Sequence, residues 1–327
     1  MNLFHVWHQE AYQGTRRKRG YFEGWYLKLI DAPRKAVFAL IPGVSIGKSE
    51  QDSHSFIQLI NAVTGKTEYF RFALDAFSAD RKTFDVRIGG NHFWDSGAEV
   101  NLQNETTQLS ASLRFEHIEK YPTSLLHPGI MGPFSFIPGM ECYHGIVNIR
   151  HTIVGSMTYQ ASVIDMTGGE GYIEKDWGRS FPQSWIWMQA NHFSAQNASF
   201  LFSIARIPWL GTAFTGLICF LRTDAGFFRF ATYNGGKVCA LTVDGDRITA
   251  TLKNATHTLD FTATYARGGI LKAPKNGMML REIEESITAE VAVTLMDHRG
   301  SIVFQDESSR VGMEIAGELS QLLSRPD

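Results

Sequence analysis

Residues 198–233 read ASFLFSIARIPWLGTAFTGLICFLRTDAGFFRFATY. The stretch is made of short runs of β-branched and aromatic residues, separated by breaks such as Asp224-Ala225-Gly226. Runs of this kind at short intervals are typical of antiparallel strands joined by tight turns. The stretch therefore predicts a β meander.

The same pattern continues on both sides of this stretch. Further strands are predicted at residues 53–62, 109–117, 145–154, 184–193, 246–254 and 257–266. Helical spacing occurs only near the C-terminus, where the apolar residues of one stripe are Met313, Ile315, Leu319, Leu322 and Leu323. Long antiparallel runs must protect their edges, and barrels or sandwiches do this. We predict an all-β protein with a short C-terminal helix.

The composition excludes several classes of protein. The 327 residues are 44% hydrophobic and 20% charged, which is ordinary for a folded protein. A formal net charge of −2 leaves no basic excess to offset a nucleic-acid backbone, so nucleic acid is not expected as a partner. Aromatic residues make up 12% of the chain, which predicts large apolar surfaces in the core or around a ligand.

Cysteine content and the N-terminus indicate the compartment. Cys142, Cys219 and Cys239 are too few and too scattered for a disulfide framework, which favours a reducing environment. The N-terminus lacks the apolar run of a signal peptide, and no stretch of about 18 apolar residues is present. We predict a cytoplasmic protein that does not span a membrane. The basic run at residues 16–19 is interpreted as a solvated turn, with transient contact to anionic lipid headgroups as the alternative.

A short motif occurs twice. Residues 20–26 read GYFEGWY and residues 171–177 read GYIEKDW, nearly half the chain apart. This repeat indicates two related β units. The proline-rich stretch at residues 121–138 predicts a long connection, with a flap over a cavity as one hypothesis. We predict two domains, at residues 1–165 and 166–327.

The strand predicted at residues 184–192 has two different faces, because side chains alternate along a strand. Aromatic and amide side chains share one face: Trp185, Trp187, Gln189 and Asn191. Apolar side chains share the other: Ile186, Met188 and Ala190. The first face suits a large apolar ligand whose polar end the amides hold. The alternative is that both indoles only pack beneath a neighbouring loop.

Acidic residues lie next to this strand in the sequence. Glu174 and Asp176 would share one face of an extended segment, where mutual repulsion and burial would favour the protonated form of one of them. That residue could donate a proton. The alternative is a structural ion-pair cluster with Lys175 or Arg179. Glu23, the counterpart of Glu174 in the repeat, allows the same two interpretations.

Other catalytic signatures are missing from the sequence. The histidines do not have the spacing of a zinc motif, so no metal site is predicted. There is no nucleophile elbow, phosphate loop or dinucleotide fingerprint, which disfavours hydrolases, kinases and dehydrogenases. His144, His192 and Cys142 could take part in proton or thiol chemistry, but a packing role is the competing interpretation.

Three motifs in order resemble the tocopherol cyclase-like proteins: YFEGWY at residues 21–26, CYHG at 142–145 and EKDWGRSFPQSWIWMQANHF at 174–193. The resemblance runs from near residue 7 to about residue 290. It implies a pair of lipocalin-like antiparallel β-barrels packed together, without a metal or a redox cofactor. In the plant members it implies an enzyme that closes a chromanol ring from a prenylated hydroquinone.

Ring closure needs a proton delivered to an alkene in an apolar, aromatic-lined cavity, and the residues offer candidates for each role. The candidate proton donors are Glu174, Asp176 and Glu23. The candidate substrate contacts are Trp25, Tyr26, His144, Trp177, Trp185, Trp187, Gln189 and Asn191. Aromatic faces stabilise a developing cation by roughly 0.5–2 kcal/mol each.

We therefore predict an intramolecular cyclase of the isomerase or lyase class that acts on a prenylated aromatic or isoprenoid. One alternative is a carrier of isoprenoid quinones or other hydrophobic small molecules that catalyses nothing. A second alternative is a scaffold with a vestigial cavity. Fold alone does not choose among them.

Overall fold

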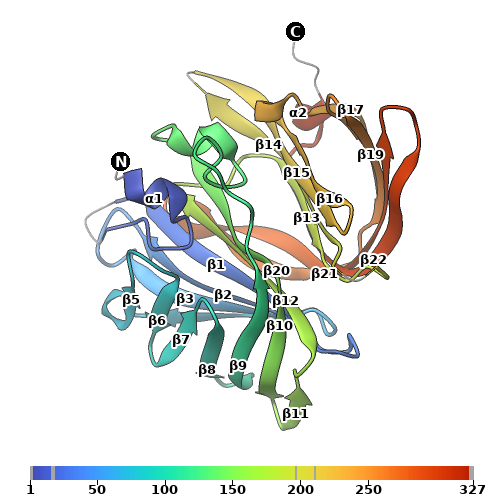
Figure 1. Ribbon diagram of the computed structural model, residues 1–327. Helices are drawn as coiled ribbons and strands as arrows, with labels where there is room; N and C mark the ends of the chain where they lie inside the picture. The colour runs from blue at the N-terminus through green and yellow to red at the C-terminus, as the bar shows by residue number, and fades with distance from the viewer. Residues whose placement is uncertain (1–2, 16–18, 196, 210, 324–327) are drawn as a thin grey trace. The chain divides into compact units, whose positions relative to one another are not determined.

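The computed structural model describes residues 3–15, 19–195, 197–209 and 211–323 (Figure 1). Its regular structure is almost entirely antiparallel β, in two sheets, which confirms the all-β prediction. The chain divides into two compact units, Met1–Phe181 with Leu271–Glu282, and Pro182–Ile270 with Ile283–Asp327. Each unit therefore contains two separate pieces of the chain. The two-domain division at residue 165 stays a prediction.

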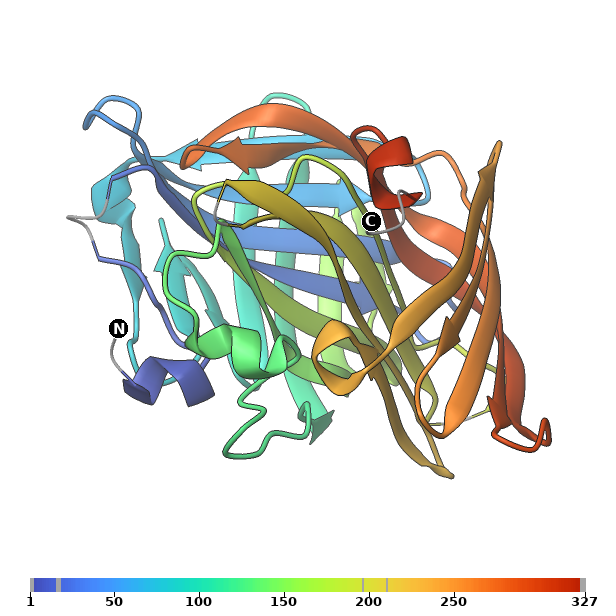
Figure 2. The ribbon, with the colours of Figure 1, turned by 90° about the horizontal axis from the view of Figure 1, so that it is seen from above.

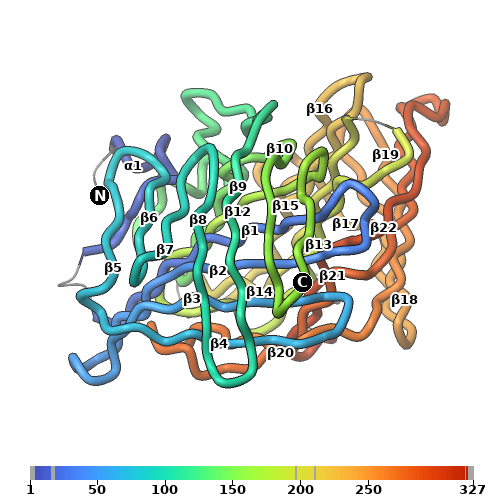
Figure 3. Tube along the Cα trace, turned by 90° about the horizontal axis from the view of Figure 1, so that it is seen from below, coloured from blue at the N-terminus to red at the C-terminus, as the bar shows by residue number. Residues whose placement is uncertain are grey.

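The first sheet has twelve strands and lies in the first unit. Its strands are β1 (Tyr21–Ile30), β2 (Val37–Ile46), β3 (His54–Asn61), β4 (Lys66–Phe72), β5 (Phe77–Ala79), β6 (Asp85–Ile88), β7 (Asn91–Trp94), β8 (Gly97–Gln103), β9 (Gln108–Glu119), β10 (Cys142–Tyr159), β11 (Ser162–Asp165) and β12 (Gly169–Gly178). Their order is β4-β3-β2-β1-β12-β10-β9-β8-β7-β6-β5, and β11 pairs with β10. Figure 3 shows the meander from β5 to β9, whose strands are neighbours in both sequence and space.

Burial along these strands distinguishes strands with one face in water from strands that are covered on both faces. On β9 only alternate side chains are buried, and Leu109, Leu113 and Phe115 belong to the apolar core of the unit. One face of this strand thus meets water, as antiparallel sheets allow. On β1 and β12 nearly every side chain is buried, on both faces. These two central strands can therefore place buried polar groups on either face.

The second sheet has ten strands. They are β13 (Trp185–Ala190), β14 (Ser199–Trp209), β15 (Thr212–Thr223), β16 (Gly226–Ala231), β17 (Lys237–Asp244), β18 (Arg247–Lys253), β19 (His257–Thr264), β20 (Gly269–Lys275), β21 (Met278–Asp297) and β22 (Ile302–Ala316). Their order is β16-β15-β14-β13-β22-β21-β19-β18-β17, and β20 pairs with β21. Consecutive strands pair from β13 to β16 and from β17 to β19, which confirms the predicted meander.

The C-terminal stripe is only partly helical. Met313 and Ile315 lie on β22, opposite Met188 and Ile186 of β13, so the prediction of helix at these two residues is wrong. The hydrogen bonds to a neighbouring strand and the burial of Met313 override the local helical spacing. The short C-terminal helix itself is confirmed as α2 (Ser320–Leu323). Across the described segments, every helix is too short to cross a bilayer.

Short helices lie in the connections. They are α1 (Leu3–Trp7), η1 (Leu74–Ala76), η2 (Gly132–Phe136) and η3 (Thr232–Asn234). The predicted long connection is confirmed, because residues 120–141 join β9 to β10 and contain η2. Figure 2 shows α1 beside η2. The rings of Trp7 in α1 and Phe136 in η2 meet edge to face.

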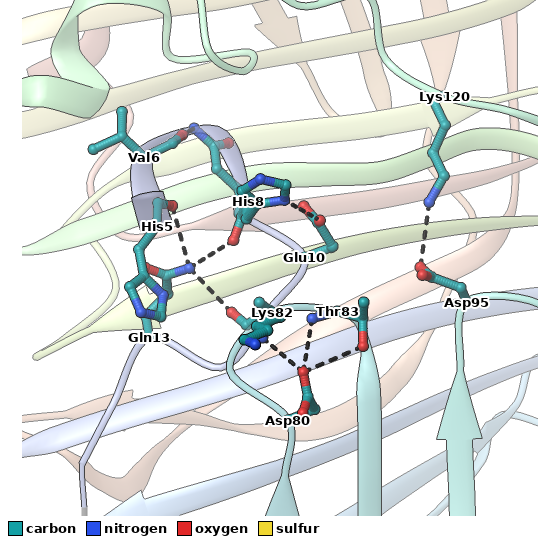
Figure 4. Close-up of polar contacts among 12 residues, drawn as sticks. His5, Val6, His8, Glu10, Gln13, Asp80, Lys82, Thr83, Asp95 and Lys120 are labelled. Atoms are coloured by element: carbon teal, nitrogen blue, oxygen red, sulfur yellow. Dashed lines mark hydrogen bonds and ion pairs between the residues drawn. The ribbon is translucent and has the colours of Figure 1, made fainter. Parts of the chain in front are cut away.

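After α1, residues 9–14 lie against the first sheet, and we call them the N-terminal strap. The side-chain amide of Gln13 folds back and donates to the backbone oxygens of His5 and His8, as Figure 4 shows. The backbone N–H of Tyr12 donates to the oxygen of Asp80 at 3.0 Å. Of the basic run, Arg16, Arg17 and Lys18 lie outside the described residues.

Candidate active site

The repeated motif lies on two strands that pair with each other. Strands β1 and β12 are antiparallel neighbours, and both copies belong to the first unit rather than beginning separate units. Each copy contains the same contact. The Tyr21 hydroxyl donates to Glu23 Oε2 at 2.5 Å, and the Tyr172 hydroxyl donates to Glu174 Oε2 at 2.6 Å. The sequence repeat is therefore also a repeat of a tyrosine–glutamate pair.

The two pairs lie on opposite faces of the sheet. Glu23 is opposite Trp177, whereas Glu174 is opposite Tyr26. Directly opposite residues share a face, and neighbouring residues along a strand do not. Glu23 consequently lies on the face that carries the apolar core, and Glu174 lies on the other face.

On the core face, Glu23 forms an ion pair with Lys175. Both side chains are fully buried, and Nζ lies 2.5 Å from Oε1. The carboxylate also accepts the backbone N–H groups of Gln13 and Gly14. Burial lowers the pKa of Lys175, and the Glu23 carboxylate opposes that shift. Lys175 also donates to the backbone oxygens of Gln9 and Ala11. Together, these contacts and the ion pair hold the N-terminal strap on the sheet.

Two of the predicted substrate contacts surround this ammonium. Lys175 Nζ lies 4.9 Å from the ring centre of Trp25 and 4.7 Å from that of Trp177. Trp25 also donates its indole N–H to Glu10 of the strap, and its ring stacks on Phe84. Within the first unit, these two indoles thus share a face with Glu23 rather than with Glu174.

On the opposite face, three predicted site residues come together. His144 Nδ1 lies 3.0 Å from Asp176 Oδ1, and His144 Nε2 lies 3.5 Å from Glu174 Oε2. The exposed fractions of the side chains are 23% for Asp176, 14% for His144 and 7% for Glu174. The imidazole therefore lies between a partly exposed carboxyl group and a buried one.

Strand register explains this meeting. His144 on β10 lies directly opposite Asp176 on β12, and Ile146 lies opposite Glu174. The register shifts immediately after Ile146, which is typical of a β-bulge. The spacing of His144 from both acids depends on this strand pairing between β10 and β12.

The connection between β9 and β10 supports His144. The backbone N–H of His144 donates to Met131 Sδ, with 3.1 Å between nitrogen and sulfur. The strap residue Gln9 packs against Gly145, where an added Cβ would lie 2.9 Å from Gln9 Oε1, and its amide donates to Ser135. Gly145 lies opposite Lys175, so the missing side chain makes room for the strap on the core face, behind the strand that carries His144.

Sequence reasoning missed two residues on this face. Tyr172 is fully buried, and burial followed by the nearby Glu174 raises its pKa, so its hydroxyl keeps its proton and donates to Glu174. Lys28 is fully buried and lies opposite Tyr172. Two signals in the sequence point to these residues. The repeat contains Tyr172, and the alternation of side chains along β1 places Lys28 on the face of Tyr26.

Cys142 contacts the same site without an activated thiol. Its Sγ lies 3.9 Å from Asp176 Oδ1. Burial, followed by the charge of Asp176, raises the pKa of the thiol. The thiol therefore stays protonated and is not suited to nucleophilic chemistry.

The other predicted contacts belong to the second unit. The core of that unit contains Ile186, Met188 and Ala190, which confirms the predicted apolar face of β13. Trp185, Trp187 and Gln189 occupy its other face and are buried, and Trp185 donates its indole N–H to Glu314 at 2.7 Å. The strand ends at Ala190, so Asn191 follows it rather than lying on it as predicted. The role of this face in ligand binding stays a prediction.

The cluster of His144, Glu174 and Asp176 also contains the atom types that bind metals, with donor atoms within 4.8 Å of one another. One ligand atom from each residue thus lies within reach of a single cation. The two ring nitrogens also face different carboxyl groups, an arrangement through which a proton can pass.

Comparison with known proteins agrees with the fold. A protein from Nitrosomonas europaea described as a candidate AttH is 14% identical, with a TM-score of 0.52 over 90% of this chain and 92% of that one. CghA is 10% identical, with a TM-score of 0.57 over 91% of this chain and 88% of that one. The structure of CghA with Sch210972 gives a TM-score of 0.56 at 10% identity, over 91% of this chain and 89% of that one. These proteins share the lipocalin-like double-barrel class of fold.

The family is shown by the sequence itself. Residues 127–317 match the family model described as "Tocopherol cyclase-like", which covers more than half of the chain and includes the site on β10 and β12. The chain belongs to the tocopherol cyclase-like family, which confirms the resemblance seen in its motifs.

Proposed function

We propose that this protein is an intramolecular cyclase that closes a chromanol-type ring on a prenylated hydroquinone, with Glu174 as the proton donor. The observation that carries this proposal is the cluster of Glu174, His144 and Asp176 on one face of two adjacent strands. Membership of the family supports it, as does the structure of the neighbour CghA with the small molecule Sch210972.

The proposed reaction is an isomerisation. The carboxyl proton of Glu174 forms a C–H bond with the less substituted carbon of a trisubstituted alkene, using the alkene electron pair, and leaves positive charge on the tertiary carbon. A lone pair of the phenolic oxygen forms the new C–O bond. The phenolic O–H bond then breaks and releases one proton, which balances the proton consumed.

Glu174 fits the role of donor better than the other two acids. Glu23 accepts hydrogen bonds from the strap and forms an ion pair with Lys175, which are interactions of a carboxylate that holds the fold. Asp176 is more exposed than Glu174. Burial and a neighbouring carboxyl group both favour the protonated form of an acid, and at Glu174 both act against the hydrogen bond that Tyr172 donates to it.

Tyr26 supplies an aromatic group next to the proposed donor. It lies opposite Glu174 on β1, and its side chain is buried. An aromatic face stabilises a nearby cation by roughly 0.5–2 kcal/mol, and more when water is excluded. We therefore assign Tyr26 to the stabilisation of the tertiary cation.

The test compares Glu174→Gln with Glu170→Gln, a matched change on the same face of the same strand. Glu170 forms an ion pair with Arg150 and does not belong to the cluster. Each protein is incubated with a prenylated hydroquinone, the ring-closed product is measured by mass spectrometry, and substrate affinity is measured by tryptophan fluorescence. We expect Glu174→Gln to lose turnover by at least about 10²-fold and to keep its affinity, and Glu170→Gln to keep both.

Two results would contradict the proposal. Full turnover by Glu174→Gln would assign the proton donor elsewhere. Tight binding of the hydroquinone by the wild type without any ring-closed product would support the carrier instead.

A further inference from the structure

The three residues of the cluster form a graded path from the surface to the proposed acid. Asp176 is the most exposed, His144 is intermediate, and Glu174 is the most buried. The two ring nitrogens of His144 face different partners, at 3.0 Å for Asp176 and 3.5 Å for Glu174. The second distance is longer than a good hydrogen bond, and such contacts often tighten when substrate binds.

We propose that His144 and Asp176 form a proton relay that reprotonates Glu174 after each ring closure. This proposal rests on the proposed function. A buried acid that gives its proton to carbon must regain one before the next turnover, and an imidazole with a partner at each nitrogen can accept a proton on one side and donate one on the other.

The relay has a balanced sequence of bonds. The proton released from the phenolic oxygen binds the Asp176 carboxylate, either directly or through solvent. Asp176 then transfers it to His144 Nδ1, and the proton on Nε2 passes to Glu174 Oε2. The imidazole ends neutral with its proton on Nδ1, and it returns to the Nε2–H tautomer by releasing that proton to water and taking one from water at Nε2. No electron is transferred, and Glu174 regains the proton that it gave to the alkene.

The other groups near the relay do not replace it. The Cys142 thiol beside Asp176 stays protonated because burial raises its pKa. The Tyr172 hydroxyl donates to Glu174, and burial raises its pKa well above the usual value, so it holds its proton through the cycle. Its role is to position the carboxyl group, while His144 is the titratable link to the more exposed Asp176.

The experiment separates the first turnover from later ones in His144→Gln. With enzyme in excess over hydroquinone, Glu174 needs no reprotonation, so we expect a first-order rate of product formation close to wild type. With substrate in excess, we expect a burst of one equivalent followed by a steady-state rate lower by about 10²-fold. Added imidazole should raise the rate of the slow phase in proportion to its concentration and leave the burst unchanged.

Two further variants make the test specific. Asp176→Asn keeps the imidazole but removes the outer acceptor, and we expect it to show the same burst and slow phase. His92→Gln changes a second histidine–aspartate pair, since His92 Nε2 lies 3.1 Å from Asp85 Oδ1 on strands β7 and β6. We expect wild-type rates in both regimes for this control.

The outcomes distinguish the relay from the proposed function. If His144→Gln slows the first turnover as much as the later ones, if its steady-state rate is unchanged, or if imidazole does not restore it, the relay is wrong while the cyclase stands. If the wild type forms no ring-closed product in either regime, both proposals are wrong. The folding of each variant is checked by its urea midpoint. If His144→Gln does not fold, the result for Asp176→Asn decides whether the relay is right.

Discussion

Lys175 shows how one residue can organise the centre of a sheet. Its ammonium group is buried between two indole rings and pairs with Glu23. Its neighbours along β12, Glu174 and Asp176, face the other way because side chains alternate. One strand thus combines a structural ion pair on the core face with a proposed catalytic cluster on the opposite face.

The buried ion pair predicts a large loss of stability when it is broken on one side. Glu23→Gln leaves the Lys175 charge buried without a countercharge, and such changes cost about 3–5 kcal/mol. The pair of Glu170 with Arg150, whose side chains are 26% and 17% exposed, is still reached by water, so Glu170→Gln predicts a smaller loss than Glu23→Gln. Urea unfolding measures both free energies. Equal losses would show that Glu23 does not have the structural role assigned here.

His151 predicts a pH dependence of folding. It is buried against Phe115 and bonds to Asn148, and burial lowers its pKa to about 3. The unfolded chain, with a pKa near 6.5, therefore binds a proton before the folded one does. Below about pH 6.5, this residue should reduce the free energy of unfolding by up to about 1.4 kcal/mol per pH unit. The loss of stability stops growing only near pH 3, where the folded protein also binds the proton.

The comparison of wild type with His151→Gln isolates this contribution. Urea unfolding is measured from about pH 7 to about pH 4 for both proteins. We expect a shallower fall in stability for the variant, whatever its stability at neutral pH. If stability fell equally steeply with pH in both proteins, His151 would not be the source of this pH dependence.

At the scale of elements, the N-terminal strap depends on the side chains beneath it. Its backbone N–H groups at Gln13 and Gly14 donate to Glu23, and its carbonyl groups at Gln9 and Ala11 accept from Lys175. The strap contributes no strand to the first sheet. Its position is therefore set by these side chains more than by a hydrogen-bonded ladder.

This dependence predicts a local change in hydrogen exchange. In Glu23→Gln, peptides that contain residues 9–14 should exchange faster than in wild type, because two amides lose a charged acceptor. Peptides from β8 and β9 should be unaffected under conditions where the variant stays folded. Exchange followed by mass spectrometry measures both. An unchanged strap would mean that other contacts hold it.

Alternation could be predicted from the sequence, but strand partners could not. The apolar face of β13 and the shared face of Glu174 and Asp176 follow from a period of two, and the structure has both. The pairing of β1 with β12 joins segments about 150 residues apart, and no local pattern encodes it. For this reason, the sequence predicts that the repeat begins two units, and it does not identify Lys175 as the partner of Glu23.

At the scale of the whole molecule, two β units carry different parts of the predicted site. The acids with His144 belong to the first unit, and the aromatic face of β13 belongs to the second. The order of strands in each sheet brings distant motifs together, which is why composition could predict a β protein with aromatic surfaces but not the geometry around Glu174.

The most direct test of the account is a conversion of prenylated hydroquinone in deuterium oxide, with wild type and Glu174→Gln in parallel. The account predicts that the wild-type product contains a single new carbon-bound deuterium, on the carbon next to the new ether carbon, and that Glu174→Gln forms almost no product. Ring closure without deuterium on carbon, or equal conversion by the variant, would contradict proton donation by Glu174.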